Sequence, residues 1–247
     1  MSRLIKFAFF LFFLSAAHGQ TEIYELRVYE LQFPRPSAVL HDYFKEALIP
    51  ALNRSGIEQI GVFEDIGETM PQKIYMLITY PNMQAIQDVA DKLASDEQFN
   101  TDTKAYNNTK PDIFPYQRIE SSFIRSTEGF PNLMNLAKTN ELFELRIYES
   151  YNEDALRRKV RMFAESEFKI FEDLELPIVF FGPNISGSQM PCLTYLLAFK
   201  DMETRDKAWS NFGPHPEWQR IVKLEEYANT VSNIHRVFLK RMDYSQM

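Results

Sequence analysis

The chain has 247 residues and 45% hydrophobic content, which is enough for one large domain or for two domains of ordinary size. Its formal net charge is −7, and because a nucleic-acid backbone is bound by basic surfaces, we expect no nucleic-acid partner. Cys192 is the single cysteine, which excludes an intrachain disulfide and a cysteine-rich metal site.

The N-terminus has the pattern of a secretory signal peptide. Arg3 and Lys6 give it a positively charged start, residues 7–14 form an apolar run, and small residues precede an expected cleavage between Gly19 and Gln20. The apolar run is too short to cross a bilayer, so we expect no integral membrane span after cleavage. The pattern predicts a mature chain that is secreted or periplasmic.

A six-residue motif occurs twice and organises the rest of the chain. Glu25-Leu26-Arg27-Val28-Tyr29-Glu30 returns at residues 144–149, an offset of 119, with isoleucine in place of valine. Tyr75 aligns with Tyr195 at an offset of 120, which suggests one net insertion between the repeats. The chain is therefore expected to be a duplication, with a signal peptide at 1–19, a first unit at 20–125, a linker at 126–140 and a second unit at 141–247.

The first unit alternates strand and helix patterns. Apolar residues at helical spacing follow a first strand, and Asn82 is suited to cap a second helix. A run of almost wholly apolar residues at 74–80 is typical of a strand covered on both faces. We expect strands at 23–31, 57–66, 74–80 and 122–125, helices at 37–54 and 83–93, and a polar, irregular segment at 95–116.

The second unit repeats this order, with Asp201 as the cap of its second helix. We expect strands at 143–151, 178–181, 193–200 and 237–240, and a first helix at 153–174. Strand, helix, strand, strand, helix, strand is the split βαβ pattern of ferredoxin-like domains. Two such sheets can cover each other's open faces, so the sequence predicts an α+β fold in which two tandem βαββαβ units form one barrel.

The repeated motif supplies the candidate ligand-binding residues. Side chains alternate along a strand, so Glu25, Arg27 and Tyr29 share one face, and the apolar residues between them share the other. We expect the apolar face to lie under the helices and the polar face to point into the barrel. The second unit would send its own copies to the same interior: Glu144, Arg146 and Tyr148.

Two interpretations of this polar interior remain open. In the first, each glutamate pairs with an arginine across the strands and the tyrosine hydroxyls complete a structural plug. In the second, a cavity remains in which the guanidinium groups bind an anionic or carbonyl-bearing ligand, with Tyr29 or Tyr148 as hydrogen-bond donor or general acid.

A second segment, Gly213-Pro214-His215-Pro216-Glu217-Trp218, follows Trp209. His215 and Glu217 have the spacing of a metal pair, but no third ligand is near, so we expect no metal. A structural role for His215 is favoured, although it stays a candidate base if it faces a cavity. The two tryptophans are expected to anchor this loop to the sheet edge.

Several familiar signatures are absent from the sequence. It contains no G-x-G-x-x-G, P-loop, G-x-S-x-G or H-E-x-x-H motif, which argues against dinucleotide enzymes, NTPases, α/β-hydrolases and zincins. His41 is a conceivable haem ligand, but a surface position on a helix is favoured. We therefore predict no cofactor.

With these residues in view, the chain resembles the NIPSNAP family. That family opens its domains with Tyr-Glu-Leu-Arg-x-Tyr-Glu and carries a tryptophan followed by His/Asp-Pro-Glu-Trp, which match residues 24–30 and 143–149 and, in the second unit only, Trp209 with residues 215–218. The first unit has Ser-Asp-Glu-Gln-Phe at 95–99 and no tryptophan. The resemblance implies a dimeric α/β-barrel, a fold whose members include cofactor-independent monooxygenases, haem-degrading enzymes and isomerases.

Two hypotheses of function follow. The first is a secreted small-molecule-binding barrel, conceivably a cofactor-independent enzyme, with the motif residues around the ligand and catalytic candidates Tyr29, Tyr148 and His215. The alternative is a non-catalytic interaction module that uses its outer helices or the 95–116 segment and has an exposed apolar patch there. The resemblance is also compatible with a homodimer formed through outer sheet edges.

Overall fold

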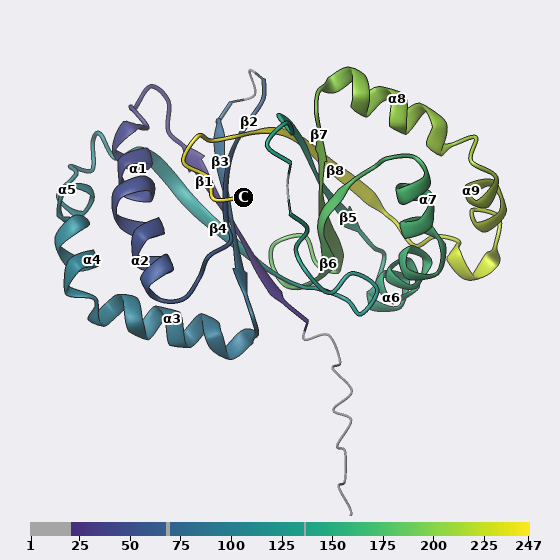
Figure 1. Ribbon diagram of the computed structural model, residues 1–247, viewed down its shortest axis with the longest axis horizontal. Coiled ribbons are helices and arrows are strands. Elements are labelled where there is room, and N and C mark those ends of the chain that lie inside the picture. The colour runs from purple at the N-terminus through teal and green to yellow at the C-terminus, as the bar shows by residue number, and fades with distance from the viewer. Residues whose placement is uncertain (1–20, 68–69, 136) are drawn as a thin grey trace, which may run out of the picture.

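The computed structural model describes residues 21–67, 70–135 and 137–247, so the predicted signal peptide lies outside the described residues. The described strands form a closed barrel in the order β1-β3-β2-β8-β5-β7-β6-β4, with antiparallel neighbours throughout. The helices of the first half cover one side of the barrel and those of the second half cover the opposite side (Figure 1). The predicted barrel of two tandem units is confirmed.

The first half follows the predicted order, with one difference in its polar segment. Residues 95–116 were expected to be irregular, but they hold two short helices, the first capped by Asp96. The elements are β1 (Ile23–Leu31), α1 (Ala38–Asp42), the π-helical turn η1 (Tyr43–Leu48), α2 (Ile49–Arg54), β2 (Ile60–Asp65), β3 (Lys73–Tyr80), α3 (Met83–Ser95), α4 (Glu97–Asp102), α5 (Lys104–Asn107) and β4 (Tyr116–Arg125).

The second half repeats these elements, including the π-helical turn inside its first helix. Asp201 accepts a hydrogen bond from the backbone of Thr204, as Asn82 does from Ala85, which confirms both predicted caps. The elements are β5 (Leu142–Glu149), α6 (Glu153–Met162), η2 (Phe163–Glu167), α7 (Phe168–Asp173), β6 (Ile178–Ser186), β7 (Cys192–Phe199), α8 (Met202–Phe212), α9 (Pro216–Ile221), the 3-10 turn η3 (Glu225–Tyr227) and β8 (Asn233–Arg241).

Two seams join the halves into one barrel. At the first, residues 63–65 of β2 pair with residues 239–241 of β8. At the second, β4 pairs with β6, and an ideal Cβ on Gly182 would lie 2.0 Å from the carbonyl oxygen of Arg125, so this close approach requires glycine. Because the barrel is closed, each described strand has a neighbour on both sides, and the homodimer through outer sheet edges stays a prediction.

The face assignment of the repeated motif was also wrong. The barrel interior is packed with the apolar residues of the motif, including Tyr24, Leu26, Phe143 and Leu145. The alternating polar residues therefore point outward, into the layers between sheet and helices, where Tyr29 contacts Phe44. The physical reason is that two sheets facing each other make the driest layer of the molecule, whereas helix side chains can reach over and satisfy polar groups.

The pairing of the third strand of each unit shows that the expected alignment of Tyr75 with Tyr195 was wrong. Arg27 pairs with Met76 in β1–β3, and Arg146 pairs with Tyr195 in β5–β7. Tyr195 therefore occupies the place of Met76 at the same offset of 119, and no residue is inserted up to this point. Tyr75 instead lies in the barrel interior, on the other face of its strand.

Candidate functional site

The polar network of the first half is compact and closed. Glu25, 5% exposed, accepts two hydrogen bonds from Arg27, at 2.7 Å from Nε and 2.9 Å from Nη2. Its carboxylate also accepts hydrogen bonds from the hydroxyls of Tyr80 at 3.0 Å and Ser121 at 2.8 Å. Glu25 and Arg27 are two residues apart on the same strand. The ion pair therefore forms along one strand, whereas we expected it to form between strands.

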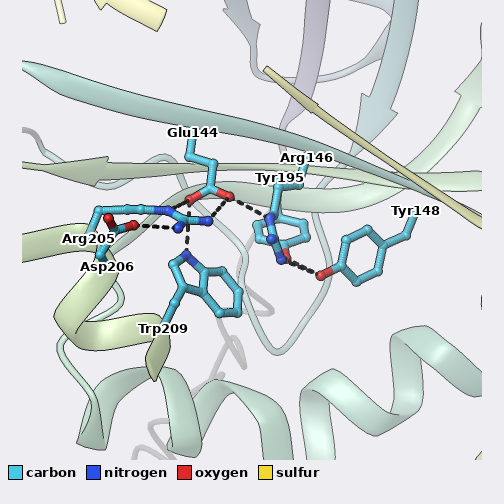
Figure 2. A network of polar contacts seen from close by, with 7 residues as sticks. All are labelled: Glu144, Arg146, Tyr148, Tyr195, Arg205, Asp206 and Trp209. Carbon is cyan, nitrogen blue, oxygen red and sulfur yellow. Dashed lines mark hydrogen bonds and ion pairs between the residues drawn. The ribbon is translucent and has the colours of Figure 1, made fainter. Parts of the chain in front are cut away.

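The corresponding network of the second half recruits a helix. Glu144 is fully buried and accepts a hydrogen bond from Arg146 Nε at 2.8 Å. From α8, Arg205 donates two hydrogen bonds to the same carboxylate at 2.8 and 3.0 Å, and Trp209 Nε1 donates one at 3.0 Å. Figure 2 shows the carboxylate held between these three donors. One carboxylate therefore faces two guanidinium groups.

Because Arg205 also donates to the Glu144 carboxylate, Nη1 of Arg146 is available for other hydrogen bonds. Its Nη1 donates to the hydroxyl of Tyr148 at 2.7 Å and lies 3.4 Å from that of Tyr195, which in turn donates to Tyr148 at 2.8 Å (Figure 2). The guanidinium also lies 4.0 Å from the ring centre of Trp209, a cation–π contact. Since the Tyr148 oxygen accepts both bonds, its own O–H proton is directed elsewhere.

Burial and charge act in opposite directions on these groups. Burial acts to raise the pKa of the Glu144 carboxyl, but the hydrogen bond from Arg205 and the charges of both arginines outweigh it, so the pKa lies below its usual value. For Glu25 the Arg27 pair likewise outweighs burial and lowers the pKa. Both carboxylates are therefore held ionised. Burial raises the pKa of Tyr195, with a smaller contribution from Tyr148.

A buried ion pair lies beside this network in the second half. Lys159 of α6 and Glu167 of η2 are 4% and 2% exposed, and their Nζ and Oε1 atoms are 2.5 Å apart. The ammonium group lies 4.9, 5.7 and 5.8 Å from the ring centres of Phe163, Tyr148 and Trp218. Burial raises the pKa of Glu167, and the charge and hydrogen bond of Lys159 act against this rise.

The ion pair and Tyr148 face a common cavity of about 290 Å³. This volume lies at the lower end of the range of small-molecule sites. Val222 and Ile234, which are 47% and 48% exposed, also line it, so its mouth opens to solvent beside them. The rest of the lining is mainly aromatic or aliphatic, and comprises Met162, Phe171, Trp209, Phe212, Trp218, Tyr227, Thr230 and Val231.

The first half has no counterpart of the ion pair. Phe44 contacts Tyr29 as Phe163 contacts Tyr148, which fixes the offset of 119 between the two first helices. At that offset Lys159 and Glu167 correspond to Leu40 and Leu48, which are 0% and 2% exposed. The same fold is therefore built with two leucines in one half and with a lysine and a glutamate in the other.

A larger groove of about 470 Å³ lies under the segment that joins the halves. Gly129, Phe130 and Met134 of that segment and Phe168 and Leu176 are among its lining residues. Its charged lining residues, Glu172 and Glu175, are both exposed. The smaller cavity is therefore the better site, because it places buried charged groups against apolar walls.

The remaining predicted residues lie outside the cavity. His215 occupies the N-cap position of α9 without a side-chain capping bond, its buried Nδ1 has no hydrogen-bond partner among the described residues, and its Nε2 lies 3.8 Å from Asp173. His41 Nδ1 lies 2.7 Å from the Tyr244 hydroxyl. Within the described ranges, His, Cys, Asp and Glu form no cluster suited to a metal ion, and no helix is both long and apolar enough to cross a membrane.

Both tryptophans line the cavity, and Trp209 also bonds to Glu144 of the sheet. Sequence reasoning missed Lys159, Glu167 and Arg205. A signal for the first two was present, because each is four residues from Phe163 and so lies on the apolar stripe of its helix. Charged residues on such a stripe, where the repeat has leucines, indicate a buried pair.

The fold and the site define a class of protein. Two ferredoxin-like units closed into one barrel, each with a polar network between sheet and helices, make a dimeric α/β-barrel whose two halves belong to one chain. The NIPSNAP family model matches residues 24–128 and 143–246, one segment in each half. The chain therefore belongs to the NIPSNAP family.

Solved structures share this fold over most of the chain. A protein of Fusobacterium nucleatum described as a candidate monooxygenase has a TM-score of 0.55 and 12% identity, over 90% of this chain and 93% of that one. One of Lactobacillus acidophilus, described in the same way, has a TM-score of 0.55 and 13% identity, over 90% and 94%. An anthrone oxidase-like protein has a TM-score of 0.54 and 7% identity, over 90% and 91%. No curated protein matches this chain. At these identities the likeness shows the fold alone.

Proposed function

We propose that the second half binds one small organic ligand in the cavity between its sheet and its helices. The observation that carries this proposal is the buried pair of Lys159 and Glu167 facing the cavity, where the first half has Leu40 and Leu48. A buried ion pair seldom stabilises a fold more than well-packed apolar residues do. Since the first half folds with leucines at these places, the pair is better explained by a ligand than by stability.

The lining sets the chemistry of this ligand. Aromatic side chains on several sides favour a flat, mainly apolar body, and Trp209, Trp218 and Phe171 supply much of that surface. The polar end is met by the ammonium group of Lys159 and by the hydroxyl of Tyr148, which both favour a carbonyl or an anionic oxygen. The ligand expected for the barrel interior is thereby placed in the helix layer instead.

The proposal extends to catalysis and to location. The solved structures described as a candidate monooxygenase and as anthrone oxidase-like give a precedent for enzymes on this fold, and the proposal that this chain is a cofactor-independent enzyme rests on its own cavity. The N-terminal pattern of Arg3, Lys6 and the apolar run at 7–14 supports action outside the cytoplasm, as a secreted or periplasmic protein. A mature N-terminus at Gln20, found by mass spectrometry, is the expected result.

The alternative of a non-catalytic interaction module has less support. Its apolar patch was expected on the outer helices or on residues 95–116, and in the latter segment α4 and α5 contain no buried residue and are mainly polar. Ile113 is the large apolar side chain exposed in that segment, at 50%. A single exposed isoleucine is ordinary for a protein surface.

Tryptophan fluorescence tests the proposal directly, because both tryptophans of the chain line the cavity. A panel of small aromatic phenols, aldehydes and carboxylates is titrated into the mature protein. We expect saturable quenching with one ligand per chain, and loss of affinity by about ten-fold or more in the double variant Lys159→Leu/Glu167→Leu, as for the loss of a charge-assisted contact. The matched control is Leu48→Met, a volume-conserving change at the position equivalent to Glu167. Absence of saturable quenching by every probe would overturn the proposal.

A further inference from the structure

We propose that the cavity takes a weak acid, either a phenol or an enolisable carbonyl compound, and holds it as its anion after Glu167 has received its proton. This inference rests on the proposed ligand-binding function and adds the substrate class and a catalytic role for Glu167. It is carried by three groups that meet at the cavity: the Glu167 carboxylate, the Lys159 ammonium and the Tyr148 hydroxyl.

The ion pair makes such a transfer neutral in charge. Before the transfer, the Glu167 carboxylate neutralises Lys159 at 2.5 Å. The O–H or C–H bond of the ligand then breaks, its proton forms an O–H bond on Glu167, and the electron pair stays on the ligand as a phenolate or enolate. Lys159 thereby exchanges one anionic partner for another, and the apolar cavity never holds an unpaired charge. No oxidant or reductant is needed.

Lys159 has hydrogen-bonding capacity for the new anion. An ammonium group has three donors, and among the described residues Nζ contacts the carboxylate of Glu167 and, at 3.7 Å, the thioether sulfur of Met162. Thioether sulfur is a weak acceptor. At least one strong donor is therefore left for a ligand oxygen.

Tyr148 supplies the second donor. Its oxygen already accepts from Arg146 and Tyr195, so its O–H proton is directed away from them, and its side chain lines the cavity. A phenolate or enolate oxygen between Lys159 and Tyr148 would therefore be met by two donors whose positions are fixed in advance. Arg146 and Tyr195 are positioning residues for this second donor.

The state of Glu167 supports its role as the base. Burial raises the pKa of its carboxyl above the ordinary value, which brings it closer to that of weakly acidic ligands. Its Oε1 accepts from Lys159, and no hydrogen bond to its Oε2 occurs among the described residues. The cavity thus contains a base next to the charge that stabilises its product.

The test uses 4-nitrophenol, whose neutral and ionised forms absorb at different wavelengths, at a pH about one unit below its solution pKa. We expect the bound probe to show the phenolate band, with its ionised fraction raised several-fold over that of the free probe. No proton should be released to the buffer, because Glu167 receives it. In Glu167→Gln the phenolate should still bind, because Lys159 lacks its anion, but its proton should now be released to the buffer, about one proton for each neutral probe that binds.

The outcomes separate the two proposals. A bound probe that stays neutral in the native protein would overturn this inference and leave ligand binding in place. A phenolate that binds the native protein with release of its proton to the buffer would also overturn it, since Glu167 would then not be the proton acceptor. If that variant does not fold, Lys159→Leu/Glu167→Leu, which copies the first half, replaces it and must lose the band. Absence of binding by this probe overturns the inference, and absence of binding by the whole panel overturns ligand binding as well.

Discussion

The two halves of the barrel share a motif, an order of elements and a register, yet they use the same helix–sheet layer differently. In the first half Arg27 gives both of its bonds to Glu25, and Leu40 and Leu48 fill the helix side of the layer. In the second half Arg205 takes over part of the carboxylate of Glu144, which frees Arg146 to hold Tyr148. The first layer is packed as an apolar core around one ion pair, whereas the second holds a further buried ion pair beside the proposed ligand cavity.

The largest expected effect comes from removing the carboxylate of Glu144. Glu144→Gln leaves the largely buried Arg146 without an anion and Arg205 with the exposed Asp206 alone, and we expect a loss of about 3–5 kcal/mol in the free energy of unfolding. Glu25→Gln leaves one arginine and two neutral donors, so its expected loss is smaller, about 1–3 kcal/mol. Urea denaturation of both variants measures the difference. Equal losses would contradict the view that the second network carries more buried charge.

The next effect distinguishes a functional ion pair from a structural one. Lys159→Leu alone leaves Glu167 buried without its cation and should cost about 3 kcal/mol or more. The double variant Lys159→Leu/Glu167→Leu reproduces the pairing of the first half and should return to within about 1 kcal/mol of the native protein. Thermal and urea unfolding of the single and double variants check this. A double variant as unstable as the single one would show that the pair is structural.

The acid limb of the stability profile should follow the two carboxylates that arginines hold ionised, Glu144 and Glu25. The pKa values of Glu144 and Glu25 are lowered in the folded state, so at acidic pH the unfolded chain binds more protons than the folded chain. Their contribution is fully present above the ordinary value of 4.5 and is lost as the pH falls through their folded values. Glu144→Gln should flatten the acid limb of the stability profile. An unchanged slope in this variant would contradict the assignment.

The smallest losses of stability are expected from removing the helix caps, and they should be similar in the two halves. Asn82 and Asp201 cap α3 and α8 through bonds of 3.0 and 2.8 Å to the third following residue. Asn82→Ala and Asp201→Ala should each cost about 1 kcal/mol, measured by urea unfolding. Because neither cap lines the cavity, 4-nitrophenol binding should stay unchanged in both. A large difference between the two losses would show that the helices of the halves are not equivalent.

Much of the architecture could be read from the sequence. The repeated motif, the helix caps and the alternation of apolar residues predicted the element order and the closure of two units into one barrel. Local periodicity carries this information, because a strand or helix needs a stripe of apolar residues wherever it packs. The short helix α4 escaped prediction because capping by Asp96 outweighs its polar composition, and α5 directly follows it in the chain.

The sequence by itself determined that Glu25, Arg27 and Tyr29, and their copies at Glu144, Arg146 and Tyr148, lie on a common face of a strand, since side chains alternate with a period of two. Only the tertiary structure decided which way that face points. A closed barrel makes its interior the driest layer and fills it with apolar residues, so the polar face must turn to the helices. The tertiary structure also decided that three further charged residues lie against this face in the second half alone. Arg205 is distant from the motif in sequence, and Lys159 and Glu167 lie on the apolar stripe of a helix.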